Sequence, residues 1–179
     1  MQNLYYSAKN LYHAKVNFKA VLKEAEAGRT LIRALAYVIK ADIKEEKNFF
    51  DALRNIGYEI KMKDLQIFYG GAKKGDWDIG IAMDMIELAH KLDVVVLVSG
   101  DGDFIPLVEH MKRAMGCRVE VLAFGKTTSS KLIDTADEFV DLDMVRRKFL
   151  IPMRQREEMP REESHLAEAA EALERTESE

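Results

Sequence analysis

Apolar positions along the chain recur with two different periods, one typical of strands and one typical of helices. Short apolar runs predict strands at residues 31–40, 58–67, 93–99, 118–124 and 138–142. Helical spacing of apolar residues predicts helices at 3–15, 44–56, 78–91, 104–115 and 129–135. Gly57 and Gly116 follow two of these helices, where glycine commonly ends a helix. This alternation of strands and helices predicts an α/β protein with a parallel sheet sandwiched between helices.

One of the predicted strands ends in two carboxylates. Residues 94–103 read VVVLVSGDGD, so a continuous apolar run is followed by Ser99, Asp101 and Asp103. In open α/β sheets, functional groups gather just past the carboxyl ends of strands. Two carboxylates this close repel each other, which favours a divalent cation between them. The alternative, that both Asp residues only form the turn and cap the next helix, stays open.

Further acidic residues lie in KKGDWDIGIAMDM at 73–85. The predicted helix there is apolar on nearly all sides, so it is expected to be largely buried, yet it carries Asp78 and Asp84. A buried carboxylate needs a metal ion, a cation or a hydrogen-bond network, because leaving it unpaired costs several kcal/mol. Asp78 has the further option of capping the helix.

Candidate phosphate-binding groups lie close to these acids in the sequence. Lys74 precedes the acidic helix, and Thr128 and Ser129 follow the strand at 118–124. Their cation, hydroxyls and helix amino terminus suit a phosphate, although an ordinary loop with a helix cap explains them equally well. Asn3 precedes the first predicted helix, and the sequence alone favours a capping role for it.

Composition limits the class of protein. With 179 residues and 47% hydrophobic side chains, the chain can bury one substantial core. Residues 151–179 hold four Arg against nine Glu, a net charge of −5, so residues 1–150 carry +1 of the formal net charge of −4. A folded part that is nearly neutral does not suit a strong duplex binder. Cys117 is the only cysteine, and no apolar run approaches the roughly 20 residues that span a bilayer, so we expect a soluble cytoplasmic protein without a membrane partner.

A family resemblance extends this interpretation. Four segments in order resemble the LabA-like branch of the NYN domain family, whose fold belongs with the PIN-like nucleases: NLYYSAKN at 3–10, KGDWDIGIAMD at 74–84, SGDGDF at 99–104 with Pro106, and TADEFVDL at 135–142. The resemblance covers residues 1–145 and implies a three-layer α/β/α, Rossmannoid domain. We expect residues 146–179 to form a charged tail that is helical or disordered.

The resemblance also implies a function. In this family an acidic cluster is thought to bind Mg²⁺ or Mn²⁺ and to hydrolyse RNA. By position, Asp78 matches the family's central acid, Asp101 and Asp103 match its strand-end pair, and Asn3 matches its early Asn. Asp84 is expected as a further metal ligand. Ser99, Lys74, Thr128 and Ser129 are the expected substrate contacts.

The sequence departs from the family at its beginning. Family members open with an apolar strand that ends in an Asp, two residues before the early Asn. Here Met1 and Gln2 take those two positions, so neither the strand nor the acid is present. The related fold places this strand in the middle of the sheet, where its loss would leave unpaired edges. We therefore expect a natural protein that is roughly ten residues longer.

Three functions compete at this stage. The leading one is a Mg²⁺- or Mn²⁺-dependent ribonuclease that acts on single-stranded RNA, with a homodimer as an option. The second is a non-catalytic module of the same fold that binds RNA or protein, because a chain that truly begins at Met1 lacks one acid. The third is another phosphotransfer enzyme with an acidic site, such as a phosphatase, although the start of the domain carries no aspartyl nucleophile motif.

Overall fold

Two parallel sheets form the centre of the molecule. The structure is a computed structural model that describes residues 2–40, 46–64, 66–67, 73–74 and 77–153. One sheet pairs β2 (Leu35–Lys40) with β3 (Glu59–Asp64), and Leu35 lies opposite Glu59. The other has the order β6 (Val94–Leu97), β7 (Arg118–Ala123) and β8 (Glu138–Asp141), with Val95 opposite Val119. Strands β2, β6 and β7 are mostly apolar, which suits a sheet that is covered on both faces, whereas β3 is charged at four of its six positions.

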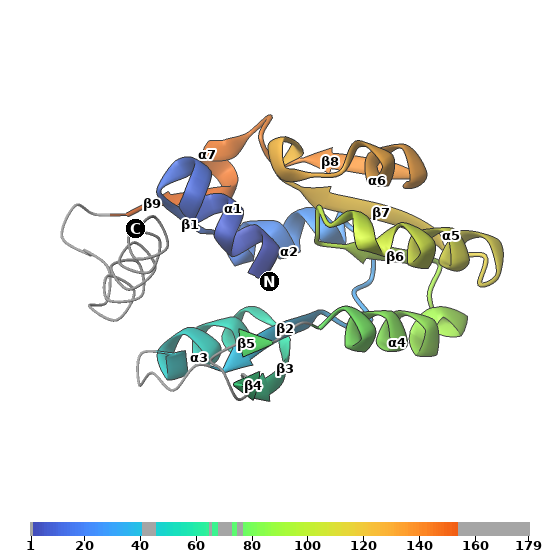
Figure 1. Cartoon of the computed structure of the whole chain (residues 1–179), viewed down its shortest axis with the longest axis horizontal. Coiled ribbons are helices and arrows are strands. Elements are labelled where there is room, and N and C mark those ends of the chain that lie inside the picture. The colour runs from blue at the N-terminus through green and yellow to red at the C-terminus, as the bar shows by residue number, and fades with distance from the viewer. Residues whose placement is uncertain (1, 41–45, 65, 68–72, 75–76, 154–179) are drawn as a thin grey trace, which may run out of the picture.

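Helices cover the strands in two layers, each with its own hydrophobic core. One core joins β6 and β7 to α4 (Asp78–Leu88), α5 (Ile105–Arg113) and α6 (Ser130–Thr135). The other joins β2 to α1 (Gln2–Tyr12), α2 (Phe18–Glu26), α3 (Glu46–Ile56) and α7 (Arg146–Phe149). The expected α/β architecture with helices on both sides of a mainly parallel sheet is therefore confirmed. In Figure 1, β2 and β3 lie below β6, β7 and β8, and the amino terminus lies between the two groups.

Short elements complete the structure. Two antiparallel pairs join β1 (Ala14–Val16) to β9 (Leu150–Pro152) and β4 (Gln66–Ile67) to β5 (Lys73–Lys74). Three 3₁₀ turns follow α4, β6 and β7, respectively: η1 (Ala89–Lys91), η2 (Gly102–Phe104) and η3 (Gly125–Thr127). No helix in the described part of the chain is long and apolar enough to cross a bilayer.

Three segments differ from the expectation. The first helix ends at Tyr12 rather than Lys15, because His13 adopts a left-handed backbone with φ of 46° and the chain then enters β1. Helix α2 was not predicted, and Asn17 caps it by accepting a hydrogen bond from the Ala20 amide. Residues 146–152 were assigned to the tail, but Phe149 is buried and β9 pairs with β1, so the folded part extends to Pro152.

Candidate metal centre

The loop after β6 holds two of the candidate acids in a fixed turn. Asp101 caps η2, and its carboxylate accepts a hydrogen bond from the Asp103 amide at 3.0 Å. This is the usual way in which an Asp stabilises a turn two residues on. The turn directs both side chains to the same end of the sheet, so the capping role that the sequence left open is fulfilled by Asp101 and does not separate the two acids.

Asp78 joins this pair from another part of the chain. It is the first residue of α4, where a negative charge is favourable because the helix dipole is positive at its amino end. One carboxylate oxygen each from Asp78, Asp101 and Asp103 lies within 4.8 Å of the other two, and none of the three residues is buried. The structure thus brings together three of the four acids that the sequence singled out.

Asn3 and Ser99 hold the backbone of the acidic loop. The Asn3 side-chain oxygen accepts a hydrogen bond from the Gly100 amide at 3.1 Å, and the buried Ser99 hydroxyl accepts one from the Asp101 amide at 3.2 Å. Helix α1 already begins at Gln2, so Asn3 lies inside the helix instead of capping it. Both residues therefore act on the loop through its backbone, beside the three carboxylates.

Thr128 and Ser129 lie against the two glycines of the same loop. A Cβ atom on Gly100 would lie 2.7 Å from the Thr128 hydroxyl and 2.9 Å from the Thr127 carbonyl oxygen, and one on Gly102 would lie 3.1 Å from the Ser129 hydroxyl. The Ser129 amide also donates to the Gly100 carbonyl at 3.0 Å. Only glycine permits this close approach between the loops that follow β6 and β7.

Sequence reasoning missed one contact that strengthens this arrangement. The Ser7 hydroxyl lies 2.8 Å from the Thr127 hydroxyl, so α1 contacts the loop after β7 as well as the loop after β6. Ser7 is buried and stands four residues after Asn3, which places both side chains on one face of the helix. This spacing of two polar residues was a signal that the sequence offered.

Asp84 does not join the cluster. Lys61 donates to its two carboxylate oxygens at 2.6 and 2.7 Å, and the Tyr37 hydroxyl donates at 2.7 Å. Burial alone would raise the pKa of Asp84, but the hydrogen bonds from Lys61 and Tyr37 outweigh it and hold the pKa below its usual range. Asp84 thus has a cation and a hydrogen-bond network, and we leave it out of the proposed ligand set.

Lys74 and Trp77 lie close to Asp78 in the sequence. Lys74 belongs to β5, but its side chain lies outside the described part of the structure. Trp77 precedes Asp78, and its indole N–H donates to the Val38 carbonyl at 2.8 Å while its ring covers Gly80. The indole therefore packs against β2 and the first turn of α4.

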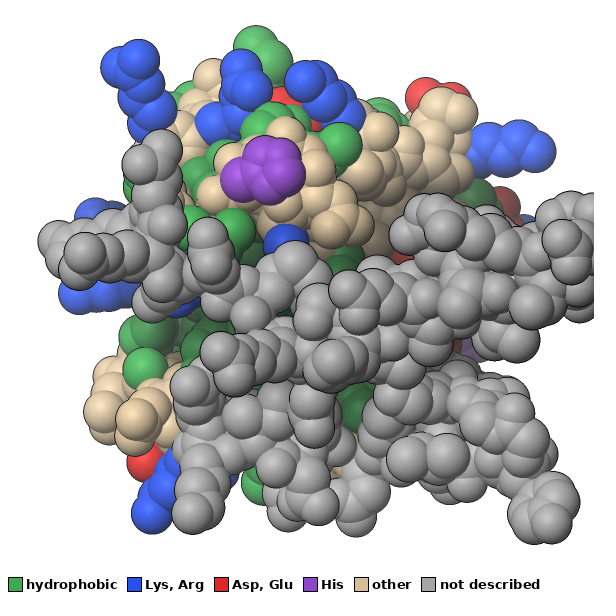
Figure 2. Space-filling model, turned by 60° about the vertical axis from the view of Figure 1, so that its left-hand side comes forward, with side chains coloured by type: hydrophobic (Ala, Val, Ile, Leu, Met, Phe, Trp, Pro, Cys, Tyr) green, Lys and Arg blue, Asp and Glu red, His purple; other side chains and the backbone are tan. Residues whose placement is uncertain are grey.

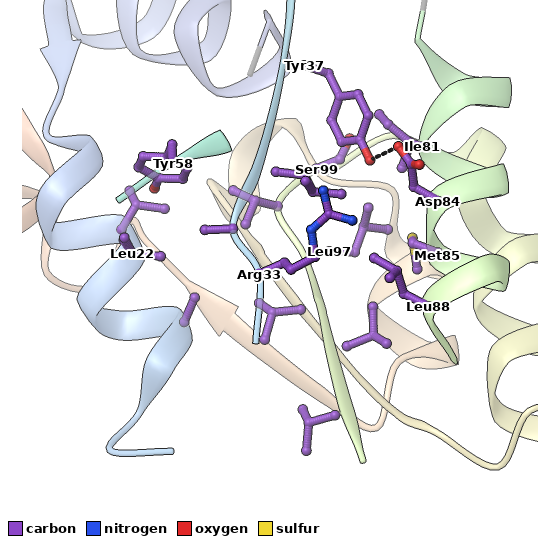
Figure 3. Close-up of a pocket in the computed structure, with 18 of the residues that line it drawn as sticks. Leu22, Arg33, Tyr37, Tyr58, Ile81, Asp84, Met85, Leu88, Leu97 and Ser99 are labelled. Carbon is purple, nitrogen blue, oxygen red and sulfur yellow. Dashed lines mark hydrogen bonds between the residues drawn. The ribbon is translucent and has the colours of Figure 1, made fainter. Parts of the chain in front are cut away.

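The cluster stands at one end of a cleft of about 900 Å³. Asn3, Asp78 and Asp101 line that end, and most of the remaining walls are apolar side chains of β2, β6, α2 and α4. Figure 3 shows Leu22 on one side and Met85 and Leu88 on the other, with Tyr37 hydrogen-bonded to Asp84 at the edge. The acids are therefore open to solvent and adjoin a large apolar space.

Comparisons with known proteins identify the family of the chain. The family model of the NYN domain matches residues 1–143. The low amplitude and bright protein LabA of Synechococcus elongatus is 30% identical over 122 residues, which span 65% of this chain and 65% of LabA. A crystal structure of a Vibrio parahaemolyticus protein of unknown function superposes with a TM-score of 0.77 at 36% identity, covering 84% of this chain and 91% of that one.

The family match spans α1, the two sheets and the loops that carry Asp78, Asp101 and Asp103. The fold and the order of the sequence motifs agree with it. The chain belongs to the NYN domain family, and its similarity to LabA is consistent with the LabA-like branch of that family.

Proposed function

We propose that this protein is a metal-dependent ribonuclease that hydrolyses phosphodiester bonds of single-stranded RNA. The observation that carries the proposal is the convergence of Asp78, Asp101 and Asp103, whose carboxylate oxygens lie within 4.8 Å of one another. Membership of a nuclease-like family supports the same reaction class. The lone Cys117 thiol suits a reducing compartment, so we place the reaction in the cytoplasm.

The three carboxylates suit Mg²⁺ or Mn²⁺. Both are hard cations that prefer oxygen ligands, and two ligands of one Mg²⁺ lie at most about 4.2 Å apart. The separations among Asp78, Asp101 and Asp103 approach this value, so small side-chain rotations suffice. Without a cation, two like charges about 4 Å apart repel by about 1 kcal/mol even at the dielectric constant of water.

Asp78, Asp101 and Asp103 would hold a divalent cation, and that cation would supply Lewis acidity that favours loss of a proton from water and offsets the charge of the phosphate. Asn3 and Ser99 accept hydrogen bonds from the Gly100 and Asp101 amides, so Asp101 and Asp103 would keep their positions during the reaction. In the hydrolysis a water oxygen bonds to phosphorus, one P–O ester bond breaks, and the leaving oxygen gains a proton.

Groups around the cluster provide contacts for the RNA backbone. The hydroxyl of Ser129 and the side chain of Lys74 are the proposed phosphate contacts, with Thr128 as support because its hydroxyl already donates to the Phe124 carbonyl at 2.8 Å. The exposed side chains of Arg146 and Lys126 lie over the Tyr12 ring at 5.3 and 5.7 Å. Figure 2 shows Lys and Arg side chains along the upper rim of the α7 and β9 side, which suits an anionic strand.

The test combines Mn²⁺ binding with RNA cleavage. The purified chain is titrated with Mn²⁺ by calorimetry and incubated with a labelled single-stranded RNA of about 20 nucleotides and with the DNA of the same sequence. We expect cleavage of the RNA that requires Mn²⁺ or Mg²⁺ and stops with a chelator. Asp101→Asn should bind Mn²⁺ at least tenfold more weakly and cleave at least a hundredfold more slowly.

Asp51→Asn is the matched control, because Asp51 is half exposed on α3 and pairs with Arg54 on the same helix, away from the three acids. It should leave both measurements unchanged. If the parent chain binds Mn²⁺ and RNA without cleaving, the non-catalytic module becomes the correct description. If Asp101→Asn and the parent chain bind Mn²⁺ equally, the three acids are not a metal site.

A further inference from the structure

Two cationic side chains gather around a single tyrosine at the carboxyl end of α1. The Arg146 guanidinium and the Lys126 ammonium lie 5.3 and 5.7 Å from the centre of the Tyr12 ring. Arg146 belongs to α7 and Lys126 to η3, and both are exposed. Figure 1 shows α1 beside α7. An aromatic face attracts cations, so Tyr12 collects positive charge from two separate segments, and we call Lys126 and Arg146 the cation pair.

The cation pair is not neutralised by carboxylates. Within the described residues, neither Lys126 nor Arg146 forms an ion pair, whereas the nearby Lys148 pairs with Glu24. Two positive groups at one ring repel each other, and an anion beside the ring would offset this repulsion. Arg and Lys side chains of this kind suit the oxygens of a phosphate.

The Tyr12 ring is held in place without a ligand. Its hydroxyl donates a hydrogen bond to the Asp143 carboxylate, which also accepts one from the Lys126 amide at 3.1 Å. The Asp143 amide donates to the Asp141 carboxylate at 2.8 Å, and the ring of Tyr12 packs against that of Phe124 with 5.5 Å between the centres. A site that is ordered in advance binds its ligand at a smaller entropic cost.

One loop leads from the cation pair to the acidic cluster. Lys126 is followed by Thr127, whose hydroxyl lies 2.8 Å from that of Ser7 on α1. Thr128 comes next and lies against Gly100, next to the first acid of the loop after β6. The loop after β7 therefore follows the side of α1 from the cation pair to the three carboxylates.

The length of α1 gives the separation between the two places. Asn3 contacts the acidic loop, and Tyr12 is nine residues further along the same helix. At about 1.5 Å per residue, these positions are about 14 Å apart along the helix axis. A stacked nucleic-acid strand rises about 3.4 Å per nucleotide. About four nucleotides therefore cover the distance, and fewer suffice when the strand is extended.

Further aromatic and cationic groups lie along this path. Tyr5, Lys9 and Tyr12 are four and three residues apart, so they share one face of α1. The Tyr5 side chain is 44% exposed, and the Lys9 ammonium lies 6.0 Å from the centre of its ring. Exposed rings that stack on bases, interleaved with cations that follow the backbone, are typical of surfaces that bind single-stranded nucleic acid without sequence preference.

We propose that this face of α1, together with Lys126 and Arg146, is a track for single-stranded RNA that leads away from the three acids. The cation pair holds a phosphate beside the Tyr12 ring, and Tyr5 stacks on a base nearer to the acids. The inference rests on the proposed function and adds a length requirement to it. An RNA that ends within about two nucleotides of the scissile bond does not reach Tyr12.

The deciding experiment measures RNA binding without metal. A fluorescein-labelled single-stranded RNA of about 20 nucleotides is titrated with the chain in a chelator, and fluorescence anisotropy is recorded at several salt concentrations. Loss of one phosphate contact reduces the slope of log affinity against log salt by about 0.7. We expect this reduction and a several-fold weaker affinity in Lys126→Gln and in Arg146→Gln. The double variant should show about twice the reduction.

Two further substitutions separate a specific contact from a general loss of charge. Arg113→Gln removes one positive charge at the carboxyl end of α5, where the side chain is 80% exposed, and should leave the slope unchanged. Tyr12→Leu removes the ring and should weaken binding several-fold. Tyr12→Phe keeps the ring and should bind RNA within about twofold of the parent chain, which shows that a loss in Tyr12→Leu comes from the ring.

RNA length tests the reach of the track. With Mn²⁺ and RNA below saturation, the double variant should cleave the 20-nucleotide RNA at least tenfold more slowly than the parent chain. Cleavage of a dinucleotide should be equal in the two chains, because a dinucleotide at the acids does not extend to Tyr12. Equal slowing with both RNAs would place the cation pair at the scissile phosphate and overturn the track.

The binding data decide the inference by themselves. It is overturned if the parent chain does not bind the RNA at low salt, if the slopes of Lys126→Gln and Arg146→Gln equal that of the parent chain, or if Arg113→Gln lowers the slope as much as they do. A chain that binds RNA through the cation pair without cleaving it keeps the track and loses the proposed function. A chain that cleaves RNA with unchanged slopes keeps the proposed function and loses the track.

Discussion

The side-chain oxygen of Asn3 accepts a hydrogen bond from the backbone amide of Gly100, 97 positions away in the chain. This bond fixes the start of α1 to the loop that carries Asp101 and Asp103. An amide that loses its acceptor in a partly buried place costs about 1–3 kcal/mol. The contact therefore connects the stability of the amino-terminal helix with the position of the acids.

Asn3→Ala removes the acceptor, so we expect a loss of about 1 kcal/mol in the free energy of unfolding and a several-fold weaker affinity for Mn²⁺. Urea unfolding and calorimetric titration measure the two effects. Asn10→Ala, at an exposed position of the same helix, is the control and should leave both unchanged. Unaltered Mn²⁺ affinity in Asn3→Ala would show that this bond does not position the acids.

Asp103→Asn should change stability in opposite directions with and without metal. In a chelator, removal of one charge relieves repulsion among the three carboxylates, so the thermal midpoint should stay equal or rise. With Mn²⁺ at a hundred times the dissociation constant, the parent chain should gain about 2.7 kcal/mol, since the ion binds only the folded state. The variant should gain much less. Scanning calorimetry under both conditions tests this, and equal gains would contradict it.

Gly100→Ala should separate the loops that follow β6 and β7. The added methyl group would lie 2.7 Å from the Thr128 hydroxyl and 2.9 Å from the Thr127 carbonyl oxygen, so one loop must move. We expect a loss of about 1–3 kcal/mol, the usual range for overpacking, and weaker Mn²⁺ binding. The double variant Gly100→Ala with Thr128→Ala should not recover, because the Thr127 backbone still blocks the methyl group. Full recovery would mean that the side chain alone was the obstacle.

Asp84→Asn tests whether Asp84 is a metal ligand, as was expected from the sequence, or pairs with Lys61 and Tyr37, as the structure shows. Because Asp84 pairs with Lys61 and Tyr37, we expect Mn²⁺ affinity within about twofold of the parent value. Stability should fall by about 1–3 kcal/mol, since buried polar groups lose a partner. Calorimetry and urea unfolding give the two numbers, and a large loss of Mn²⁺ affinity would return Asp84 to the ligand set.

The Asp84 carboxylate makes the free energy of unfolding depend on pH. The pKa of Asp84 is lowered in the folded protein, so its contribution to stability is present above the unfolded pKa of about 3.9 and is lost as the pH falls from there through the folded pKa. Below about pH 4 the stability of the parent chain should therefore decline more steeply than that of Asp84→Asn. Urea midpoints between pH 3 and pH 7 measure the two slopes, and parallel curves would contradict the assignment.

The strands and helices with long apolar patterns could be predicted from the sequence. Strand β6 is apolar along its whole length, β7 is apolar at four of its six positions, and α5 shows apolar residues at helical spacing, so each was expected close to its observed position. Strands β1 and β9 have only three residues each. Pairing of such short segments depends on tertiary contacts that bring Ala14 opposite Pro152, which no local pattern records.

The positions of the acids could be predicted from the sequence, but the residues that surround and neutralise them could not. Asp101 and Asp103 follow a buried strand, and the rule for strand ends places them correctly. Asp84 shares an apolar helix with Asp78, but six positions separate them, so they point to different sides of the helix. The cation that neutralises Asp84 comes from Lys61 on β3, and this distant partner could not be read from the sequence.

Trp77 is an intrinsic fluorescence probe of the candidate site. It is the only tryptophan in the chain, it stands next to Asp78, and its ring contacts Tyr37 at the border of the cleft. Fluorescence emission from this single indole therefore changes when water leaves the surroundings of Asp78 or the cleft. A titration with Mn²⁺ can thus be followed without a label, and Asp101→Asn shows how much of the signal depends on the acids.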